Sequence, residues 1–276
     1  MLEIAEFISP TPSPVWKLAQ QAGVNLAVGG LPFDTLKADE QVGDYAPLSR
    51  MKDVYDNAGF KIAVIEARPP LNKAKRGLPG RDEEIATVCT MIESMGRLGI
   101  PVWCYEWMAD FNWVRTNLAT PSRGGSVVTS FDVNDVRDDM TSEPPISEEA
   151  LWEHLEYFLK IVLPVAEKAG VKLSMHPDDP PLSPIAGVGR IMRSVDNFQR
   201  LIELVPSKMN TITMCQGNFT LMTDDLPSVI RKLADKALVH SLPRRAGRAR
   251  AVRGNLARCG QNRHACVHES ISGHRF

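Results

Sequence analysis

Three side chains that commonly bind metal ions each stand directly after a short apolar or β-branched run of this sequence. They are His176, Cys215 and His240. Runs of this kind are typical of buried strands in α/β proteins, where ligands and metals bind at the carboxyl ends of the strands. Two imidazoles and a thiolate suit a divalent transition metal such as Mn²⁺, Fe²⁺, Co²⁺ or Zn²⁺. The pattern therefore predicts that these three residues are metal ligands at one edge of a parallel sheet.

A second set of polar side chains follows strand candidates and predicts a substrate-binding site. Glu66 ends one strand candidate, and Asp178 follows His176 in a proline-rich segment. Arg115 lies in an aromatic segment after another strand, and its guanidinium can grip a carboxylate with two hydrogen bonds. We expect these three residues to bind substrate, although Arg115 packed on Trp113 at the surface is the competing interpretation for that residue.

The elements that must position these residues alternate between strands and helices. Such alternation predicts a parallel sheet. Each expected helix carries apolar residues at helical spacing, and acidic residues lie in the first turn of two of them. Strands are expected at residues 25–28, 61–65, 101–105, 172–175, 211–214 and 237–239, and helices at residues 47–57, 81–98, 147–169, 195–205 and 226–234.

The chain therefore resolves into about six βα units, which predicts an α/β fold of the TIM-type (β/α) barrel class that is incomplete. A full barrel needs eight such units. The longest loop expected spans residues 118–145, rich in Gly, Ser, Asp and Pro, and either a substrate lid or a plain surface insertion fits it. Residues 1–240 form the predicted barrel domain, and residues 241–276 form an irregular basic tail.

Charge and composition narrow the class of protein. The net charge of −1 hides a tail from residue 241 with eight arginines and one acidic residue, whereas residues 1–240 hold 24 basic and 32 acidic side chains. The tail lacks aromatic residues between its arginines and helical periodicity, so we expect no nucleic-acid binding. No apolar run is long enough for a membrane helix, and no signal peptide is expected at the N-terminus. Five cysteines, an odd number, favour reduced thiols in the cytoplasm.

Several motifs, in order, resemble those of the mannonate dehydratase family, in the xylose-isomerase-like group of TIM barrels. The resemblance covers about residues 60–240, and its most specific motif is His-Pro-Asp-Asp-Pro-Pro at residues 176–181. The other motifs are Gly-Leu-Pro-Gly-Arg-Asp at 77–82, Cys-Tyr-Glu-Trp-Met at 104–108, Trp-Val-Arg-Thr at 113–116, Gly-Arg-Ile at 189–191 and Cys-Gln-Gly at 215–217.

This resemblance implies a hydro-lyase that removes water from D-mannonate to give 2-keto-3-deoxy-D-gluconate in glucuronate breakdown. It implies Mn²⁺ or Fe²⁺ as cofactor, held in part by His176, Cys215 and His240, and a small sugar acid as the binding partner. A homo-oligomer is compatible with it. Removal of a proton next to a carboxylate and departure of a hydroxyl group are the two demands of this chemistry.

The resemblance ends near Ser241. The family continues with a His-Asp-Asp-Gly stretch, which carries an aspartate ligand and an acid/base histidine, and later with a catalytic tyrosine. Residues 258–263 have the sequence Arg-Cys-Gly-Gln-Asn-Arg instead, so the sequence assigns no catalytic acid or base. A frameshift near codon 241 is our hypothesis for this change. Translating the gene in the neighbouring frame tests it, because two further βα units and a His-Asp-rich motif should appear there.

Two other functions remain open from the sequence. One is a metal-dependent sugar isomerase or epimerase of the same barrel group, although such sites usually use carboxylate-rich ligand sets in which a cysteine is unusual. The other is a non-catalytic, truncated product, because loss of barrel units leaves sheet edges unpaired.

Overall fold

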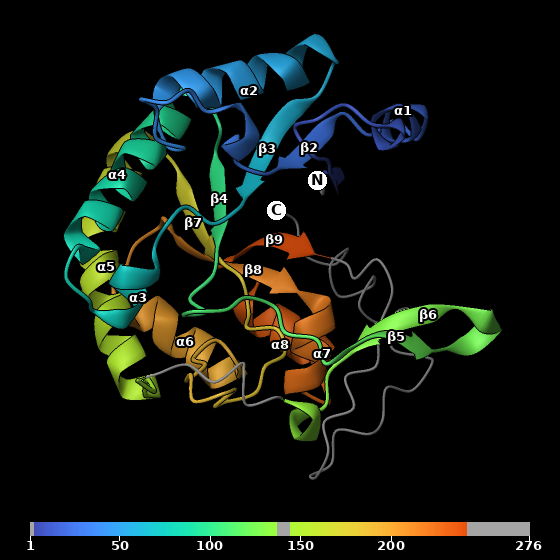
Figure 1. Cartoon of the computed structure of the whole chain (residues 1–276), viewed down its shortest axis with the longest axis vertical. Helices are drawn as coiled ribbons and strands as arrows, with labels where there is room; N and C mark the ends of the chain where they lie inside the picture. The colour runs from blue at the N-terminus through green and yellow to red at the C-terminus, as the bar shows by residue number, and fades with distance from the viewer. Residues whose placement is uncertain (1–2, 137–143, 242–276) are drawn as a thin grey trace. The chain divides into compact units, whose positions relative to one another are not determined.

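The computed structural model of the protein describes residues 3–136 and 144–241. Seven strands of these residues form one parallel sheet in the order β1-β2-β3-β4-β7-β8-β9. The strands are β1 (Ala5–Phe7), β2 (Leu26–Gly29), β3 (Lys61–Glu66), β4 (Val102–Tyr105), β7 (Lys172–Met175), β8 (Asn210–Cys215) and β9 (Ala237–Ser241) (Figure 1).

The strand order follows the chain order, which confirms the predicted fold class. A doubly wound sheet reverses its strand order at a switch point, whereas the (β/α) barrel adds each strand beside the preceding one. Six of the seven strands match the runs predicted from the sequence. The strand β1 was missed because it is only three residues long and none of the three is buried. Residues 242–276, including the 258–263 segment, lie outside the described residues.

The helices connect these strands. Five of the eight lie within two residues of the positions expected from the sequence, whereas the helices at Pro14–Gln21, Asn72–Arg76 and Gln216–Met222 were not predicted. In α4 three acidic side chains occupy the first turn, where they favour the positive end of the helix dipole, and Gly99 ends the helix in the left-handed conformation. The Ser147 hydroxyl accepts a hydrogen bond from the Ala150 amide, as expected for the N-cap of α5. The helices are α1 (Pro14–Gln21), α2 (Tyr45–Asn57), α3 (Asn72–Arg76), α4 (Arg81–Leu98), α5 (Glu148–Ala169), α6 (Val195–Leu204), α7 (Gln216–Met222) and α8 (Leu226–Leu233), with 3₁₀ turns η1 (Phe33–Thr35), η2 (Arg123–Gly125) and η3 (Val133–Asp135).

None of the helices within the described ranges combines the length and the apolar character needed to cross a bilayer.

The chain divides into two compact units. Among the described residues, the first holds residues 3–105, Glu156–Met175 and Val205–Thr211, and the second holds residues 106–136, 144–155, His176–Leu204 and residues 212–241. In the first unit Trp16 stacks on Tyr55 with 5.2 Å between ring centroids, and the Tyr55 hydroxyl donates to the Ile8 carbonyl at 2.6 Å. These contacts fix α1 and α2 against the first strands.

In the second unit the segment predicted as a long loop, residues 118–145, contains regular structure. Strands β5 (Asn117–Pro121) and β6 (Val127–Ser130) form an antiparallel hairpin that projects as an arm (Figure 1). The expectation of an irregular loop is wrong here, because alternation within each strand is too short to be recognised from sequence. A small apolar cluster of Val114, Phe131 and Ile185 lies at the base of this arm.

Close packing in the first unit leads to a stability prediction at Gly96. A Cβ atom at this position would lie 2.6 Å from the Ala169 carbonyl oxygen and 2.9 Å from the Ala169 Cβ. Both partners are held by the end of α5, so Gly96→Ala should lower the free energy of unfolding by roughly 1–3 kcal/mol. Gly30→Ala is the matched control, because a Cβ at Gly30 meets no atom within 4 Å. Urea denaturation of both variants measures the difference, and equal midpoints would contradict the packing described.

Candidate active site

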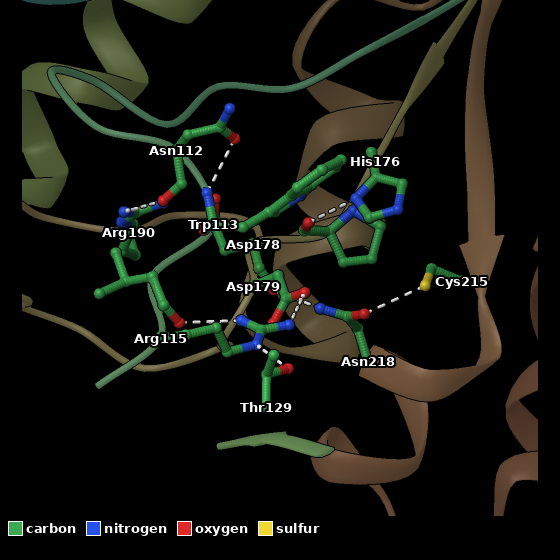
Figure 2. Close-up of polar contacts among 12 residues, drawn as sticks. Asn112, Trp113, Arg115, Thr129, His176, Asp178, Asp179, Arg190, Cys215 and Asn218 are labelled. Carbon is green, nitrogen blue, oxygen red and sulfur yellow. Dashed lines mark hydrogen bonds and ion pairs between the residues drawn. The ribbon is translucent and has the colours of Figure 1, made fainter. Parts of the chain in front are cut away.

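His176 leaves β7 as its first residue beyond the strand and is buried, with 8% of its surface exposed. Its Nδ1–H donates a hydrogen bond to the Pro177 carbonyl oxygen, 2.8 Å away (Figure 2). Because a carbonyl oxygen only accepts, the neutral ring carries its proton on Nδ1 and its lone pair on Nε2. This tautomer is the one that lets Nε2 bind a metal ion or accept a proton.

Asp178, two residues after His176, is fully buried, and two hydrogen bonds join it to Met192. Its Oδ2 accepts from the Met192 amide at 2.7 Å, and its own amide donates to the Met192 carbonyl at 2.9 Å. The other carboxylate oxygen, Oδ1, is buried and has no hydrogen-bond partner among the described residues. Burial raises the pKa of Asp178 to about 6, although the Arg190 guanidinium opposes this shift. Asp178 is therefore a buried carboxyl group that titrates close to neutral pH.

Arg190 is fully buried in the same unit and anchors the segment after β4. Its Nη2 donates to the carbonyl oxygens of Phe111 and Asn112 at 3.1 and 3.2 Å (Figure 2). The guanidinium carbon also lies 4.9 Å from the centroid of the Phe111 ring. The sequence indicated this residue only as part of a family motif, since nothing in the local pattern shows that an arginine at that position is buried.

Arg115 makes three contacts within the protein. Its Nη2 donates to Asp179 Oδ2 at 2.7 Å, its Nη1 to the Val114 carbonyl at 2.8 Å and its Nε to Thr129 Oγ1 at 3.3 Å (Figure 2). The Val114 amide also donates to the Asp179 carbonyl. The guanidinium thus links the β5–β6 arm to the segment after His176. These hydrogen bonds do not decide between substrate binding and packing on Trp113, so the substrate-binding role of Arg115 stays a prediction.

Cys215 ends β8 and is held by the helix that follows. Its Sγ–H donates to Asn218 Oδ1 at 3.0 Å, and Asn218 Nδ2 donates to the Asp178 carbonyl at 2.8 Å (Figure 2). Sequence reasoning missed Asn218, because it expected no helix between residues 214 and 226, where the structure has α7. The signal was available in principle: an amide three residues after a cysteine faces it once the segment is helical.

His240 lies in β9, and both of its ring nitrogens are buried without a hydrogen-bond partner among the described residues. Burial lowers the pKa of His240. A buried neutral imidazole with unsatisfied nitrogens is suited in chemistry to a metal ion.

The expected convergence of the three metal donors is not found. Within residues 3–136 and 144–241, no group of three His, Cys, Asp or Glu side chains is placed so that it could hold a metal ion. The β8–β9 register gives a physical reason, since it pairs Met214 with His240 and Cys215 with Ser241. Successive residues of a strand project to opposite faces, so Cys215 and His240 leave this ladder on opposite faces. The donor types fit a transition metal, and the ligand roles of His176, Cys215 and His240 stay a prediction.

Glu66 is the last residue of β3 and is half-buried. It belongs to the first unit, whereas Arg115 and Asp178 belong to the second. Its predicted contact with substrate stays a prediction.

A sequentially ordered parallel sheet, with buried histidine, cysteine and carboxyl side chains at the carboxyl ends of its strands, defines an α/β protein of the (β/α)-barrel type. A sequence model of the D-mannonate dehydratase (UxuA) family matches residues 15–144 and 133–248. The chain belongs to this family.

Related proteins agree with the family assignment. Mannonate dehydratases from Streptococcus pneumoniae (strain 70585) and Streptococcus suis (strain 05ZYH33) are each 38% identical to this chain over 209 residues, which is 66% of this chain and 57% of each relative. The chain therefore matches little more than half the length of these relatives. The crystal structure of mannonate dehydratase from Streptococcus suis serotype 2 superposes with a TM-score of 0.75 at 29% identity, covering 87% of this chain and 72% of that one. A D-psicose 3-epimerase superposes with a TM-score of 0.58 at 8% identity, covering 84% of this chain and 68% of that one, and so shares the fold alone.

The raised pKa of Asp178 leads to a pH-dependent stability difference. Its folded-state pKa of about 6 lies above the ordinary value of 3.8, so the folded state keeps this proton while the unfolded state loses it. As pH rises from about 4 to about 6, this group therefore lowers the free energy of unfolding, by roughly 3 kcal/mol in total. Asp178→Asn keeps an acceptor for the Met192 amide and removes the ionisation. Between pH 4 and 7, urea denaturation should show a larger loss of stability in the wild type than in this variant.

Asp235→Asn, a change at an exposed carboxylate, serves as the control for this comparison. It should leave the pH dependence of stability as in the wild type. Parallel pH profiles for the wild type and Asp178→Asn would contradict the assignment of Asp178 as the titrating group.

Proposed function

We propose that this protein is a hydro-lyase that dehydrates D-mannonate to 2-keto-3-deoxy-D-gluconate in hexuronate catabolism. The observation that carries the proposal is the family match over residues 15–248. The relatives named mannonate dehydratase support it at 38% identity. The polar residues after β4, β7 and β8 supply groups that the reaction needs.

The substrate is an anion, so the site needs a cation for its carboxylate and groups that move a proton. Arg115 is the cation we assign to the substrate carboxylate. It is 28% exposed at its side chain and pairs with Asp179, so the substrate would exchange for that partner rather than fill an empty position. Asp178 and Glu66 are the further substrate-binding residues of the proposal. Buried Asp178, with a pKa of about 6, can hold or release a proton near neutral pH.

Mn²⁺ or Fe²⁺ is the cofactor we propose, with His176, Cys215 and His240 as the residues that would hold it. When bound, such an ion stabilises the negative charge that develops as the proton next to the carboxylate is removed, and it assists departure of the hydroxyl group. The support is the chemistry of the donors, the Nδ1–H tautomer of His176 and the unpartnered buried nitrogens of His240.

The cysteines within the described residues, Cys89, Cys104 and Cys215, form no disulfide, which agrees with a cytoplasmic location.

A second candidate is a member of this family that does not turn over substrate. One observation favours it: the described residues do not assemble a group of three metal-binding side chains. An isomerase or epimerase is not favoured, because the likeness to D-psicose 3-epimerase is one of fold at 8% identity.

An assay of the purified chain with D-mannonate and Mn²⁺, monitoring the keto product, separates the two candidates. A working dehydratase should form product and should contain bound metal by elemental analysis. His176→Ala should then lose stoichiometric metal and reduce turnover by at least about a hundredfold, because a ligand and its lone pair are removed. His154→Ala, a change on α5, is the control and should retain both. Absence of product from the wild type with metal bound would contradict the dehydratase, and absence of both product and metal would favour the second candidate.

A further inference from the structure

Two buried amide side chains on the same short helix, α7, differ in how their hydrogen bonds are satisfied. Gln216 is 4% exposed and Asn218 is 6% exposed. The Asn218 amide is used at both ends, because it accepts from Cys215 Sγ and donates to the Asp178 carbonyl. The Nε2 group of Gln216 is buried and has no hydrogen-bond partner among the described residues.

An unpartnered N–H group in a protein interior is costly. More than about nine in ten buried polar groups are hydrogen-bonded, and each exception calls for a reason. The free energy lost when the N–H group leaves water is not recovered if no acceptor is present. A buried amide with a purely structural role has its hydrogen-bond partner within the protein, as Asn218 does. A buried amide that binds a ligand has its partner in the ligand.

The position of Gln216 supports a ligand. It directly follows Cys215 at the carboxyl end of β8, which is the end at which (β/α)-barrel proteins bind their ligands. A second unsatisfied atom, Oδ1 of fully buried Asp178, lies on the segment that Asn218 ties to α7. One unused donor and one unused acceptor thus occur on two segments joined by a hydrogen bond. A hydroxyl group both accepts and donates, so a polyhydroxy acid supplies the chemistry that these two groups lack.

We propose that Gln216 is a substrate-binding residue whose Nε2 donates a hydrogen bond to an oxygen of the sugar acid, a hydroxyl or the carboxylate. This inference rests on the proposed function for the identity of the ligand. An amide recognises an oxygen without adding charge, and a site built around such a donor rejects analogues that lack the oxygen. Gln216 then contributes to substrate selection, while Arg115 pairs with the negative charge of the substrate carboxylate.

The test compares Gln216→Leu with Asn218→Leu, which removes the fully satisfied amide two residues away. For each purified protein, isothermal titration calorimetry with D-mannonate in the presence of Mn²⁺ gives the dissociation constant, and urea denaturation gives the midpoint without ligand. Gln216→Leu should bind D-mannonate at least about tenfold more weakly, and its denaturation midpoint should stay the same or rise, because an unpaired polar group is replaced by an apolar one. Asn218→Leu should lower the midpoint, because two hydrogen bonds are lost.

The outcomes separate this inference from the proposed function. If the wild type does not bind D-mannonate, the proposed function fails, and the denaturation midpoints still judge Gln216. A midpoint for Gln216→Leu as low as that of Asn218→Leu would show that Gln216 serves structure and would overturn the inference. Unchanged affinity for D-mannonate in Gln216→Leu would overturn it as well.

Discussion

The burial of charged and polar groups just beyond β7 is the constraint on which the candidate site depends. Asp178 and Arg190 are both fully buried, and an isolated charge in such surroundings is strongly disfavoured. Backbone groups supply the hydrogen-bond partners: the Met192 amide donates to the Asp178 carboxylate, and the carbonyls of Phe111 and Asn112 accept from the Arg190 guanidinium. These bonds fix the chain that follows His176, and one carboxylate oxygen of Asp178 has no hydrogen-bond partner among the described residues.

The same network joins three parts of the second unit that are distant in sequence. Arg115 and Asp179 connect the β5–β6 arm to the segment after β7, and Asn218 connects that segment to Cys215. Arg115 and Asp178, two of the residues proposed to bind substrate, therefore also take part in the bonds that hold this unit together. A ligand that bound to Arg115 would have to compete with Asp179, so binding and local order are coupled through one guanidinium.

Much of the fold could be predicted from the sequence, because its signals are local. The strands of the sheet from β2 onward are short apolar or β-branched runs, and the long helices α4 and α5 show helical spacing and caps. The failures occurred where the local signal was weak: β1 is three residues long, the strands of the hairpin have four or five residues each, and α7 has no apolar periodicity long enough to outweigh Gly217.

For the candidate site, the sequence by itself determined which chemistry-bearing residues follow the strands, and with them the family. Residue type and position relative to an apolar run are properties of a few neighbouring residues, so they can be read along the chain. Only the tertiary structure decided which groups meet. Partners 40, 64 and 79 positions apart, as for Asn218 with Asp178, Arg115 with Asp179 and Arg190 with Phe111, come together through strand pairing and loop packing. The same packing decided that Cys215 and His240 leave their ladder on opposite faces, because the register depends on the neighbouring strand as well as on a strand's own hydrophobic pattern.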